Sequence, residues 1–367
     1  MRDAPRPARA SDSHTLLQLE GVTKHLPVKG GMPWHRDREF VHAVDGVDLQ
    51  VRRGETLGLV GETGSGKSTL ARCMTRLLDL TSGTVRLDGE DISRLRGREL
   101  RPYRRRMQMI FQDPYGSLNP RRRVGSLIAE PFAVHGEAEG PERKERVQEL
   151  MELVGLSPEH YNRFPAEFSG GQRQRIGVAR ALALRPELIV ADEPVSALDV
   201  SIRAQVINLL AELQQQFNLT YVFITHDLSV VRHVSDRVAV MYLGQVVEVA
   251  DRHDLYTKPR HPYTKVLQSA IPVPDPDESD RRSRSAVGGE PPSPINPPTG
   301  CRFHPRCPKA QARCSVEAPT LEVKFSDPPG HLAACHFPLG DGEELPAMGR
   351  VAAAVGGSGD VGGRAVG

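Results

Sequence analysis

A glycine-rich segment that joins a short apolar run to a helix-like stretch restricts the fold more than any other feature of the sequence. Thr56–Val60 is expected as a strand and Ser68–Leu78 as a helix, and the segment joining them matches a phosphate-binding loop, Gly61-Glu62-Thr63-Gly64-Ser65-Gly66-Lys67-Ser68-Thr69. Its glycines let backbone N–H groups surround phosphate oxygens, Lys67 supplies a charge and Ser68 a hydroxyl for Mg²⁺. A glycine turn beside a surface lysine is the alternative, but a chance match to the whole pattern is uncommon. The segment therefore predicts a nucleotide site.

Two carboxylates follow a second apolar run. Leu188–Ala191 has the continuous apolar, β-branched character of a buried parallel strand, and Asp192 and Glu193 come directly after it. A strand beside the phosphate loop would bring Asp192 to the magnesium ion, and Glu193 could polarise the attacking water as a general base. Taken alone, two acids after a strand could equally begin a turn.

A third motif opens a helix-like run with small residues. Its sequence is Phe168-Ser169-Gly170-Gly171-Gln172, and arginines follow it. A hydroxyl and two glycines at the start of a helix form a second anion-binding surface. The motif is weak by itself, because Ser-Gly-Gly is common in loops.

The order of the other elements predicts an α/β fold with a mostly parallel core sheet. Helix-like Ser201–Asn218 separates the apolar runs Leu188–Ala191 and Tyr221–Thr225, which makes a β-α-β unit. Leu16–Val22 and Val41–Val51 roughly alternate apolar and polar residues, as antiparallel strands do. Helical periodicity dominates from residue 124 to about residue 184.

Composition excludes several classes of protein. Across 367 residues the formal net charge is only +2, so no nucleic-acid partner is expected. The first residues lack an apolar segment, which predicts no secretory signal, and no uncharged apolar run is long enough to span a bilayer. Five cysteines without an export signal argue against a disulfide framework.

Together the motifs resemble those of ABC-transporter ATPases. Besides the phosphate loop and the Asp192-Glu193 pair, the matching residues are Gln112 in Phe-Gln-Asp-Pro, Ser169-Gly170-Gly171-Gln172, Asp199 in Ser-Ala-Leu-Asp, and His226. The resemblance implies a P-loop NTPase fold of the ABC ATPase type, with an antiparallel β subdomain and a helical subdomain. It also implies a head-to-tail pair of such domains that encloses two ATP molecules.

The resemblance assigns a role to each motif. Glu193, His226 and Lys67 are the expected catalytic residues, and Ser68, Gln112 and Asp192 are expected around Mg²⁺. Ser169 and Gly171 would contact the γ-phosphate bound by the partner domain, and Asp199 would arrange the interface. The family usually stacks adenine on an aromatic residue near position 26, where this chain has His25-Leu26. Either His25 stacks on the base or the base is held by apolar contact, and no adenine-stacking residue is assigned.

Longer stretches resemble the ATP-binding subunits of oligopeptide and dipeptide permeases, namely Met109–Arg121, Asp192–Ile202, His261–Thr264 and a cysteine-bearing C-terminal module. Those importers carry two different ATPases, and this chain resembles the second of them in the Lys29–Glu39 insertion, His42–Val47 and Ser293–Pro298. The resemblance implies a heterodimer with a first-type ATPase on the cytoplasmic face of two permease subunits. An extracytoplasmic binding protein would deliver the cargo.

The permease is expected to contact Pro114–Pro131 and Tyr161–Phe168. Relatives import oligopeptides, dipeptides, nickel chelates, glutathione or sugars, so the cargo stays open. A soluble ABC ATPase without a transport role is the less favoured alternative.

The expected organisation has four parts. Residues 1–14 and 339–367 are expected as disordered tails, and residues 15–257 as the ATPase domain, with the helical subdomain at about 115–182. Residues 258–338 form an extension with a linker at 272–298 and the cysteine module at 300–337.

The cysteine module predicts a metal centre. Four thiolates, Cys301, Cys307, Cys314 and Cys335, suit either a 4Fe–4S cluster or Zn²⁺. The closely paired cysteines common at zinc sites are absent, and members of the resembling family carry a 4Fe–4S cluster on these residues. Zinc, with His304, His331 or His336 as further ligands, and four unligated thiols stay open as alternatives.

Overall fold

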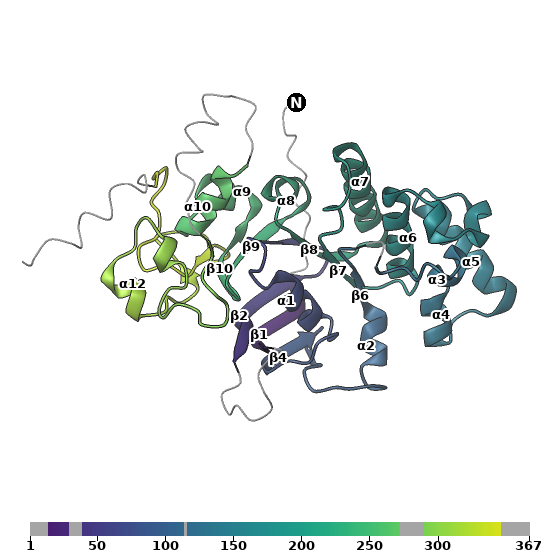
Figure 1. Cartoon of the computed structure of the whole chain (residues 1–367), viewed down its shortest axis with the longest axis horizontal. Helices are drawn as coiled ribbons and strands as arrows, with labels where there is room; N and C mark the ends of the chain where they lie inside the picture. Colours follow the sequence, from purple (N-terminus) through teal and green to yellow (C-terminus); the bar gives the residue numbers. More distant parts are fainter. Residues whose placement is uncertain (1–13, 29–38, 114–115, 272–289, 346–367) are drawn as a thin grey trace, which may run out of the picture.

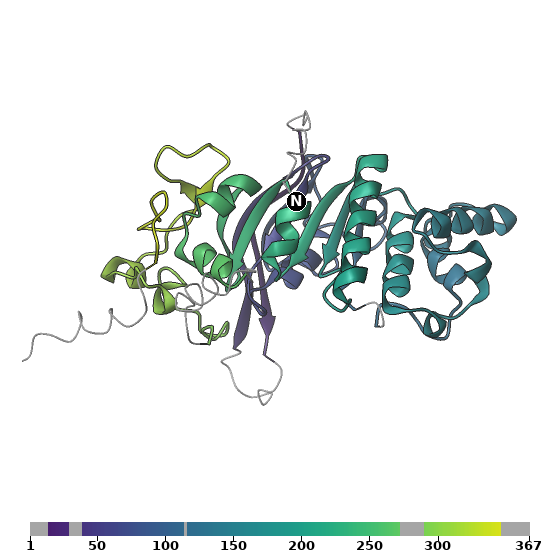
Figure 2. The same ribbon diagram turned by 90° about the horizontal axis from the view of Figure 1, so that it is seen from above.

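The computed structural model describes residues 14–28, 39–113, 116–271 and 290–345. Several predicted segments lie outside the described residues: residues 1–13 of the predicted N-terminal tail, most of the Lys29–Glu39 insertion, most of the predicted linker, and the chain beyond residue 345. Figures 1 and 2 both place a cluster of helices at one end of the molecule, the sheets in the middle and the C-terminal extension at the other end. In the described part of the chain, no helix has the length and apolar character needed to cross a membrane.

The core is an eight-stranded sheet in the order β11-β12-β10-β9-β3-β8-β7-β6. Its parallel strands are β3 (Thr56–Val60), β6 (Met107–Ile110), β7 (Leu188–Asp192), β8 (Thr220–Thr225) and β9 (Arg237–Tyr242). Every residue of β3, β7, β8 and β9 is buried, which explains their continuous apolar sequences. The other three strands are antiparallel, namely β10 (Gln245–Asp251), β11 (Glu322–Val323) and β12 (Leu332–Ala333).

A second, antiparallel sheet has the order β2-β1-β4-β5. Its strands are β1 (Thr15–Pro27), β2 (Phe40–Arg52), β4 (Ser82–Leu87) and β5 (Glu90–Asp91). Leu17, Leu70 of helix α1 (Lys67–Met74) and Val190 of β7 belong to one apolar cluster, so α1 is packed between the two sheets. Helix α2 (Arg101–Arg106) leads into β6.

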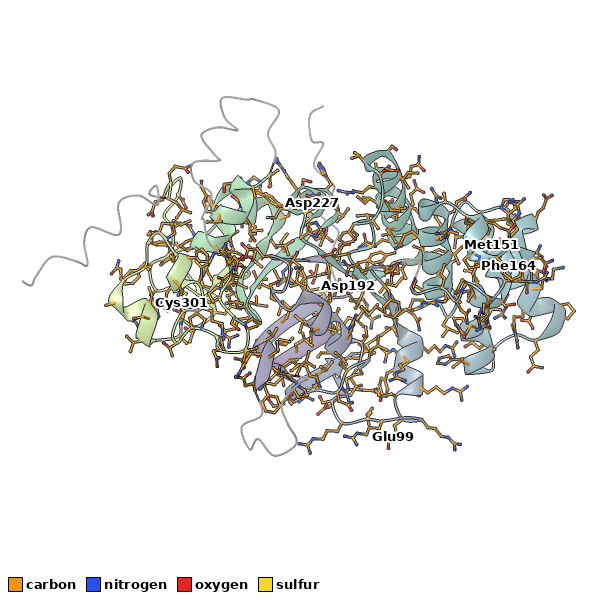
Figure 3. All side chains as sticks on the ribbon, in the orientation of Figure 1. Glu99, Met151, Phe164, Asp192, Asp227 and Cys301 are labelled. Atoms are coloured by element: carbon orange, nitrogen blue, oxygen red, sulfur yellow. The ribbon has the colours of Figure 1, made fainter. Side chains whose placement is uncertain are left out.

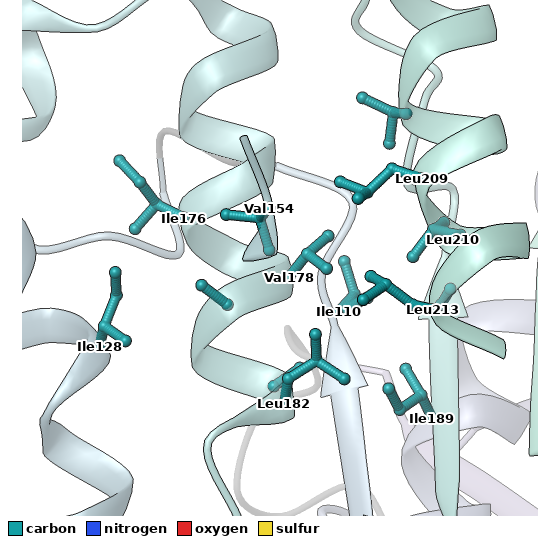
Figure 4. Packing of buried hydrophobic residues seen from close by; sticks show 14 of the residues in the cluster. Ile110, Ile128, Val154, Ile176, Val178, Leu182, Ile189, Leu209, Leu210 and Leu213 are labelled. Atoms are coloured by element: carbon teal, nitrogen blue, oxygen red, sulfur yellow. The ribbon is translucent and has the colours of Figure 1, made fainter. Parts of the chain in front are cut away.

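The helical part contains α3 (Val124–Ile128), α4 (Glu130–His135), α5 (Gly140–Leu153) and α6 (Gly170–Leu182), with 3₁₀ turns at Pro158–Asn162 and Pro165–Glu167. Figure 4 shows Val178 and Leu182 of α6 facing Leu209, Leu210 and Leu213 of α7 (Val200–Phe217). Ile110 of β6 and Ile189 of β7 join the same cluster. The helical part is therefore continuous with one face of the core sheet.

The C-terminal extension packs against the β9–β10 side of the core. The elements on this side of the molecule are helices α8 (Leu228–Val234), α9 (Arg252–Thr257), α10 (Pro262–Ser269) and α12 (Ala312–Val316), a 3₁₀ turn at His304–Arg306, and strand β12. Tyr242, Tyr263 and Phe303 form its apolar centre. Glu248 of β10, which is 0% exposed, accepts hydrogen bonds from the backbone N–H groups of Arg260 and His261 and is bonded to the His331 ring.

The predicted C-terminal tail is wrong at its start. Leu339 is 1% exposed and Leu345 is 9% exposed, and both belong to the apolar cluster of the extension. Two isolated leucines among glycines and acids give no periodic pattern, so only their packing identifies residues 339–345 as part of the folded extension.

Candidate functional site

The phosphate loop lies between β3 and α1 and needs glycine at two positions. Gly66 has φ 103° at the N-cap of α1, and a Cβ there would lie 2.0 Å from the carbonyl oxygen of Ala43. Gly61 has φ 155°, and a Cβ there would lie 2.1 Å from the carbonyl oxygen of Met241. Backbone that passes this close to β2 and β9 excludes any side chain. The loop is therefore packed against both neighbouring strands.

Lys67 is 5% exposed and lies across the loop. Its Nζ donates to the carbonyl oxygens of Gly61 at 2.7 Å and Glu62 at 2.8 Å. Burial lowers the pKa of Lys67, and the carboxylates of Glu193, Asp192 and Glu62 oppose that shift. The ammonium is thus held as a buried charge where the loop can bind phosphates.

Asp192 ends β7 next to the first turn of α1. Ser68 Oγ donates to Asp192 Oδ1 at 2.9 Å, and Asp192 is 2% exposed. Burial raises the pKa of Asp192, while the hydrogen bond from Ser68 lowers it. A hydroxyl and a carboxylate side by side supply the oxygen ligands that Mg²⁺ prefers.

Glu193 is held by two other predicted residues. Gln112 Nε2 donates to Glu193 Oε2 at 2.9 Å, and His226 Nδ1 lies 3.2 Å from Glu193 Oε1. Gln112 follows β6, Glu193 follows β7 and His226 follows β8, and these strands are neighbours in the sheet. Binding residues meet at the carboxyl edge of such a sheet. Figure 3 places Asp192 in the middle of the molecule.

This arrangement can support attack of water on a bound phosphate. A carboxylate that two polar side chains orient beside a phosphate loop can accept a proton from the attacking water. Glu193 has φ 45°, and its backbone N–H donates to the carbonyl oxygen of Ile224. The backbone of β8 therefore helps to fix the direction of its side chain.

The structure does not bring the Ser169–Gln172 motif to this chain's own phosphate loop. Ser169 caps α6 by accepting from Gln172 N–H, and the Gln172 side chain accepts from Ser169 N–H. A Cβ on Gly171 would lie 2.4 Å from Ile202 Cγ2 of α7. Ser169 is exposed, as is Asp199 at the N-cap of α7. Ser169 and Asp199 therefore present a polar surface that a second molecule can reach, whereas Gly171 is buried in this chain.

His25 is occupied by contacts within the chain. Its ring centroid lies 4.1 Å from that of His42, directly opposite on β2, and its Nε2 lies 3.5 Å from Asp45 Oδ1. Asp45 in turn accepts a hydrogen bond from Arg302 of the extension, which neutralises its charge. The contacts of His25 therefore identify no adenine-stacking residue within the described part of the chain.

Sequence reasoning missed a group of residues behind the phosphate loop. Arg306 donates to both carboxylate oxygens of Glu62, at 2.8 and 3.1 Å, and the backbone N–H of Glu62 donates to the Tyr263 hydroxyl at 2.9 Å. The only signal in the sequence was that Tyr263 and Arg306 fall in stretches typical of the resembling family. Nothing in the sequence paired either of them with the loop.

The four cysteines of the extension line one small cavity, together with His304 and His336. Burial raises the pKa of Cys307 and of Cys335 to about 12, so thiolates there need a compensating positive charge. Nδ1 of His304 lies 2.9 Å from the carbonyl oxygen of Cys301, Nε2 of His336 lies 2.9 Å from that of Glu317, and His331 is bonded to Glu248. All four thiols line the cavity, and the rings of His304 and His336 in its wall each have one nitrogen within hydrogen-bond distance of a backbone carbonyl oxygen.

Comparisons with known proteins agree with this geometry. Residues 44–196 match the family described as ABC transporter, and residues 247–314 match the family described as oligopeptide/dipeptide transporter, C-terminal region. An ATP-binding cassette, solved as a dimer in a post-hydrolysis state bound to ADP and phosphate, superimposes with a TM-score of 0.57 at 31% identity. That superposition covers 64% of this chain and 98% of the cassette.

Curated relatives cover most of the sequence. The chain is 53% identical over 329 residues to the oligopeptide transport ATP-binding protein AppF of Bacillus subtilis, covering 89% of this chain and 99% of the relative. It is 53% identical over 325 residues to a "Probable peptide ABC transporter ATP-binding protein" of Sinorhizobium fredii, covering 88% of this chain and 90% of the relative. The chain therefore belongs to the ABC-transporter ATPases, in the group of oligopeptide/dipeptide transport ATP-binding proteins, and it is an enzyme that binds and hydrolyses ATP.

Proposed function

We propose that this chain energises the import of oligopeptides or dipeptides through an ABC transporter. The observation that carries the proposal is the convergence of Lys67, Asp192, Glu193, Gln112 and His226 at one sheet edge, in a chain whose relatives are named for peptide transport. The match of residues 247–314 to the oligopeptide/dipeptide transporter C-terminal region also supports it. Nickel chelates, glutathione and sugars are the alternative cargoes.

ATP hydrolysis drives a cycle of closing and opening between two ATPase domains. The exposed Ser169 and Asp199 support a head-to-tail dimer in which Ser169 and Gly171 bind the γ-phosphate on the partner's phosphate loop. ATP closes the dimer because both domains contact its γ-phosphate in the closed state only, and hydrolysis removes that contact. The partner is a first-type ATPase, in a heterodimer.

Within this chain's half of the site, Glu193 acts as general base on the attacking water, and His226 orients Glu193 and the γ-phosphate. Lys67 neutralises charge on the phosphates. Ser68, Asp192 and Gln112 would hold Mg²⁺, which supplies positive charge to the phosphate oxygens when bound.

A groove beside Gln112 is suited to a permease. Phe111, Pro131, Val134 and Leu77 line it, and Val134 is 57% exposed while Leu77 is 46% exposed. A short cytoplasmic helix of a permease subunit would cover these apolar side chains and contact the segment next to Gln112. Tyr161 is packed against Gly125 instead, so we place the main contact nearer to Pro131 than to Tyr161. The chain would then work at the cytoplasmic face of the membrane, with an extracytoplasmic binding protein delivering cargo.

The cysteines hold a 4Fe–4S cluster in this proposal, with Zn²⁺ as the alternative. Among the described residues, the one group of His, Cys, Asp or Glu ligand atoms all within 4.8 Å of one another is His25, His42 and Asp45. Three thiols of the module are therefore not that close. Ligands of one tetrahedral zinc ion, with Zn–S bonds of about 2.3 Å, would lie about 3.8 Å apart. The wider spacing favours a larger group, and iron, acid-labile sulfide and zinc analysis of anaerobically purified protein decides between them.

Uptake of labelled peptides by cells that lack the gene tests the cargo. Cells complemented with the wild-type gene should recover uptake of di- or oligopeptides, and cells complemented with Glu193→Gln should not, because the variant lacks the general base. If uptake of these peptides does not depend on the gene, the peptide cargo is wrong while the ATPase assignment stands.

A further inference from the structure

Glu62, the second residue of the phosphate loop, is fixed at three points. Its backbone N–H donates to the Tyr263 hydroxyl, its carbonyl oxygen accepts from Lys67 Nζ, and its carboxylate accepts two hydrogen bonds from Arg306. The Arg306 contact is bidentate, which fixes direction as well as distance. Two of these three contacts come from the C-terminal extension.

Arg306 is held in place by an aromatic platform. It is 8% exposed, and its guanidinium carbon lies 5.9 Å from the centroid of the Tyr242 ring. The rings of Tyr242, Tyr263 and Phe303 lie 4.6 to 5.3 Å from one another. Tyr242 ends β9, the strand beside β3, which leads into the loop. Both ends of the contact therefore rest on the core sheet.

This contact is additional to the common ATPase fold. Tyr263 and Arg306 lie within residues 247–314, which match the oligopeptide/dipeptide transporter C-terminal region. The solved cassette is 98% covered by a superposition that takes in only 64% of this chain, so its fold is complete without such an extension.

We propose that Arg306 and Tyr263 are positioning residues for nucleotide binding, and that through Glu62 the extension sets the affinity of the phosphate loop for ATP and ADP. Holding the loop in one conformation reduces the ordering that binding would otherwise require. Arg306 also neutralises a carboxylate that would repel the phosphates. Because coupling between two sites is reciprocal, bound nucleotide stabilises the docking of the extension in return.

The proposal depends on ATP binding, which the family assigns, and not on the cargo or on the group held by the cysteines. It extends the proposed function by giving the extension a role in the ATPase cycle. If peptide uptake did not depend on the gene, or if the cysteines held no iron and sulfide, this proposal would still stand, because its tests measure nucleotide affinity.

The test compares Arg306→Gln with a matched control, Arg302→Gln, in the purified full-length chain. Arg302 docks the same module through Asp45 and the carbonyl oxygen of Leu243, but it makes no hydrogen bond to the phosphate loop. Equilibrium binding of a fluorescent ATP analogue and of ADP is measured first. Steady-state hydrolysis in the assembled transporter then separates KM from kcat.

Arg306→Gln should weaken binding of both nucleotides by about five- to tenfold, since a bidentate charged contact is lost and Glu62 is left unpaired. Its kcat at saturating ATP should stay within about twofold of wild type, because the contact is equally strong in the ATP-bound ground state and in the transition state. Arg302→Gln should change affinity by less than about twofold. Equal weakening by both variants would mean general loss of docking and would overturn the proposal, as would unchanged affinity in Arg306→Gln.

A double substitution separates positioning from folding. Glu62→Gln combined with Arg306→Gln should bind ATP more tightly than Arg306→Gln alone, because the unpaired carboxylate is gone. Tyr263→Phe, which removes only the hydroxyl, should weaken binding by about threefold. If Arg306→Gln does not fold, Glu62→Gln/Arg306→Gln and Tyr263→Phe still decide, and wild-type affinity in both would refute the proposal.

Discussion

Gly66 shows how closely one residue of the phosphate loop is specified. A side chain here meets two obstacles, the left-handed backbone and the carbonyl oxygen of Ala43 at 2.0 Å. Gly64 also has positive φ, 83°, but nothing lies within 4 Å of the position of its Cβ. Comparing substitutions at Gly66 and Gly64 therefore separates the cost of backbone strain from the cost of steric overlap.

Gly66→Ala should lower the free energy of unfolding by about 3 kcal/mol, because β2 or the loop must move. Gly64→Ala should cost only about 1 kcal/mol, the strain of left-handed backbone alone. Urea unfolding of the full-length variants measures both values. Equal losses would show that the loop moves away from β2 without resistance.

At the scale of secondary-structure elements, an ion-pair network joins the base of both sheets. Glu187, before β7, accepts from Arg53 at 2.6 Å and from Arg106 of α2, and both arginines also pair with Asp88 after β4. Hydrogen bonds, the larger effect from Arg106 and a smaller one from Arg53, hold the pKa of Glu187 below its usual value. Networks with bidentate arginines contribute more than isolated surface pairs.

Glu187→Gln should lower stability by about 1 kcal/mol at pH 7, with the loss shrinking as the pH falls. The folded pKa of Glu187 is depressed, so its stabilisation is fully present above the unfolded pKa of about 4.3 and is lost as the pH falls further, through the lower folded pKa. Urea midpoints at about pH 7 and about pH 3 check this. Glu142→Gln, which breaks an exposed pair with Arg146 on α5, is the control and should show little loss at either pH.

The strands predicted best were those buried on both faces. Leu188–Ala191 and Tyr221–Thr225 were evident because parallel strands need apolar residues throughout. Strand β6 was missed because its four residues, Met107–Ile110, follow a run of arginines. The two-residue strands β11 and β12 depend on tertiary pairing, because β12 pairs with the edge of β10 and β11 pairs with β12.

The motifs of the candidate nucleotide site could be recognised because each of them is local in sequence. The contact of Arg306 with Glu62 could not, because 244 residues separate the two side chains. A pair of opposite charges at that separation has no pattern in the sequence. Only the packing of Tyr242 and Phe303 brings the two residues together.

On the scale of the whole molecule, the proposed paired arrangement would make this chain contribute half of each of two sites. The phosphate loop with Glu193 lies at the sheet edge, while Ser169 and Asp199 are exposed at the starts of α6 and α7, and Val200 beside them is 81% exposed. The family's paired arrangement would cover that surface. Changes at Ser169 should then affect catalysis on the partner domain rather than the stability of this one.

Ser169→Asn should keep the cap of α6, since asparagine is as good an N-cap residue, and leave the melting temperature within about 2 °C. Hydrolysis by the assembled transporter should fall by at least about tenfold, because a γ-phosphate contact is lost, while this chain's own affinity for ATP stays unchanged. Ser157→Asn, at the start of the 3₁₀ turn Pro158–Asn162, is the matched control. Normal hydrolysis by Ser169→Asn would contradict the paired arrangement.

Strand β12 bears on self-association, because an uncovered strand edge can pair with strands of other chains. It covers the edge of β10, where Val246–Ala250 are all buried, and the sheet ends in β11, a strand of only two residues. Truncation after α9 would uncover the backbone groups of β10 that now pair with β12 and with Ala334, beside the buried side chains of Val247 and Val249. Because an uncovered edge of this kind recruits strands from other chains into aggregates, we expect an ATPase domain produced without the extension to need charged residues or a substitute strand along β10.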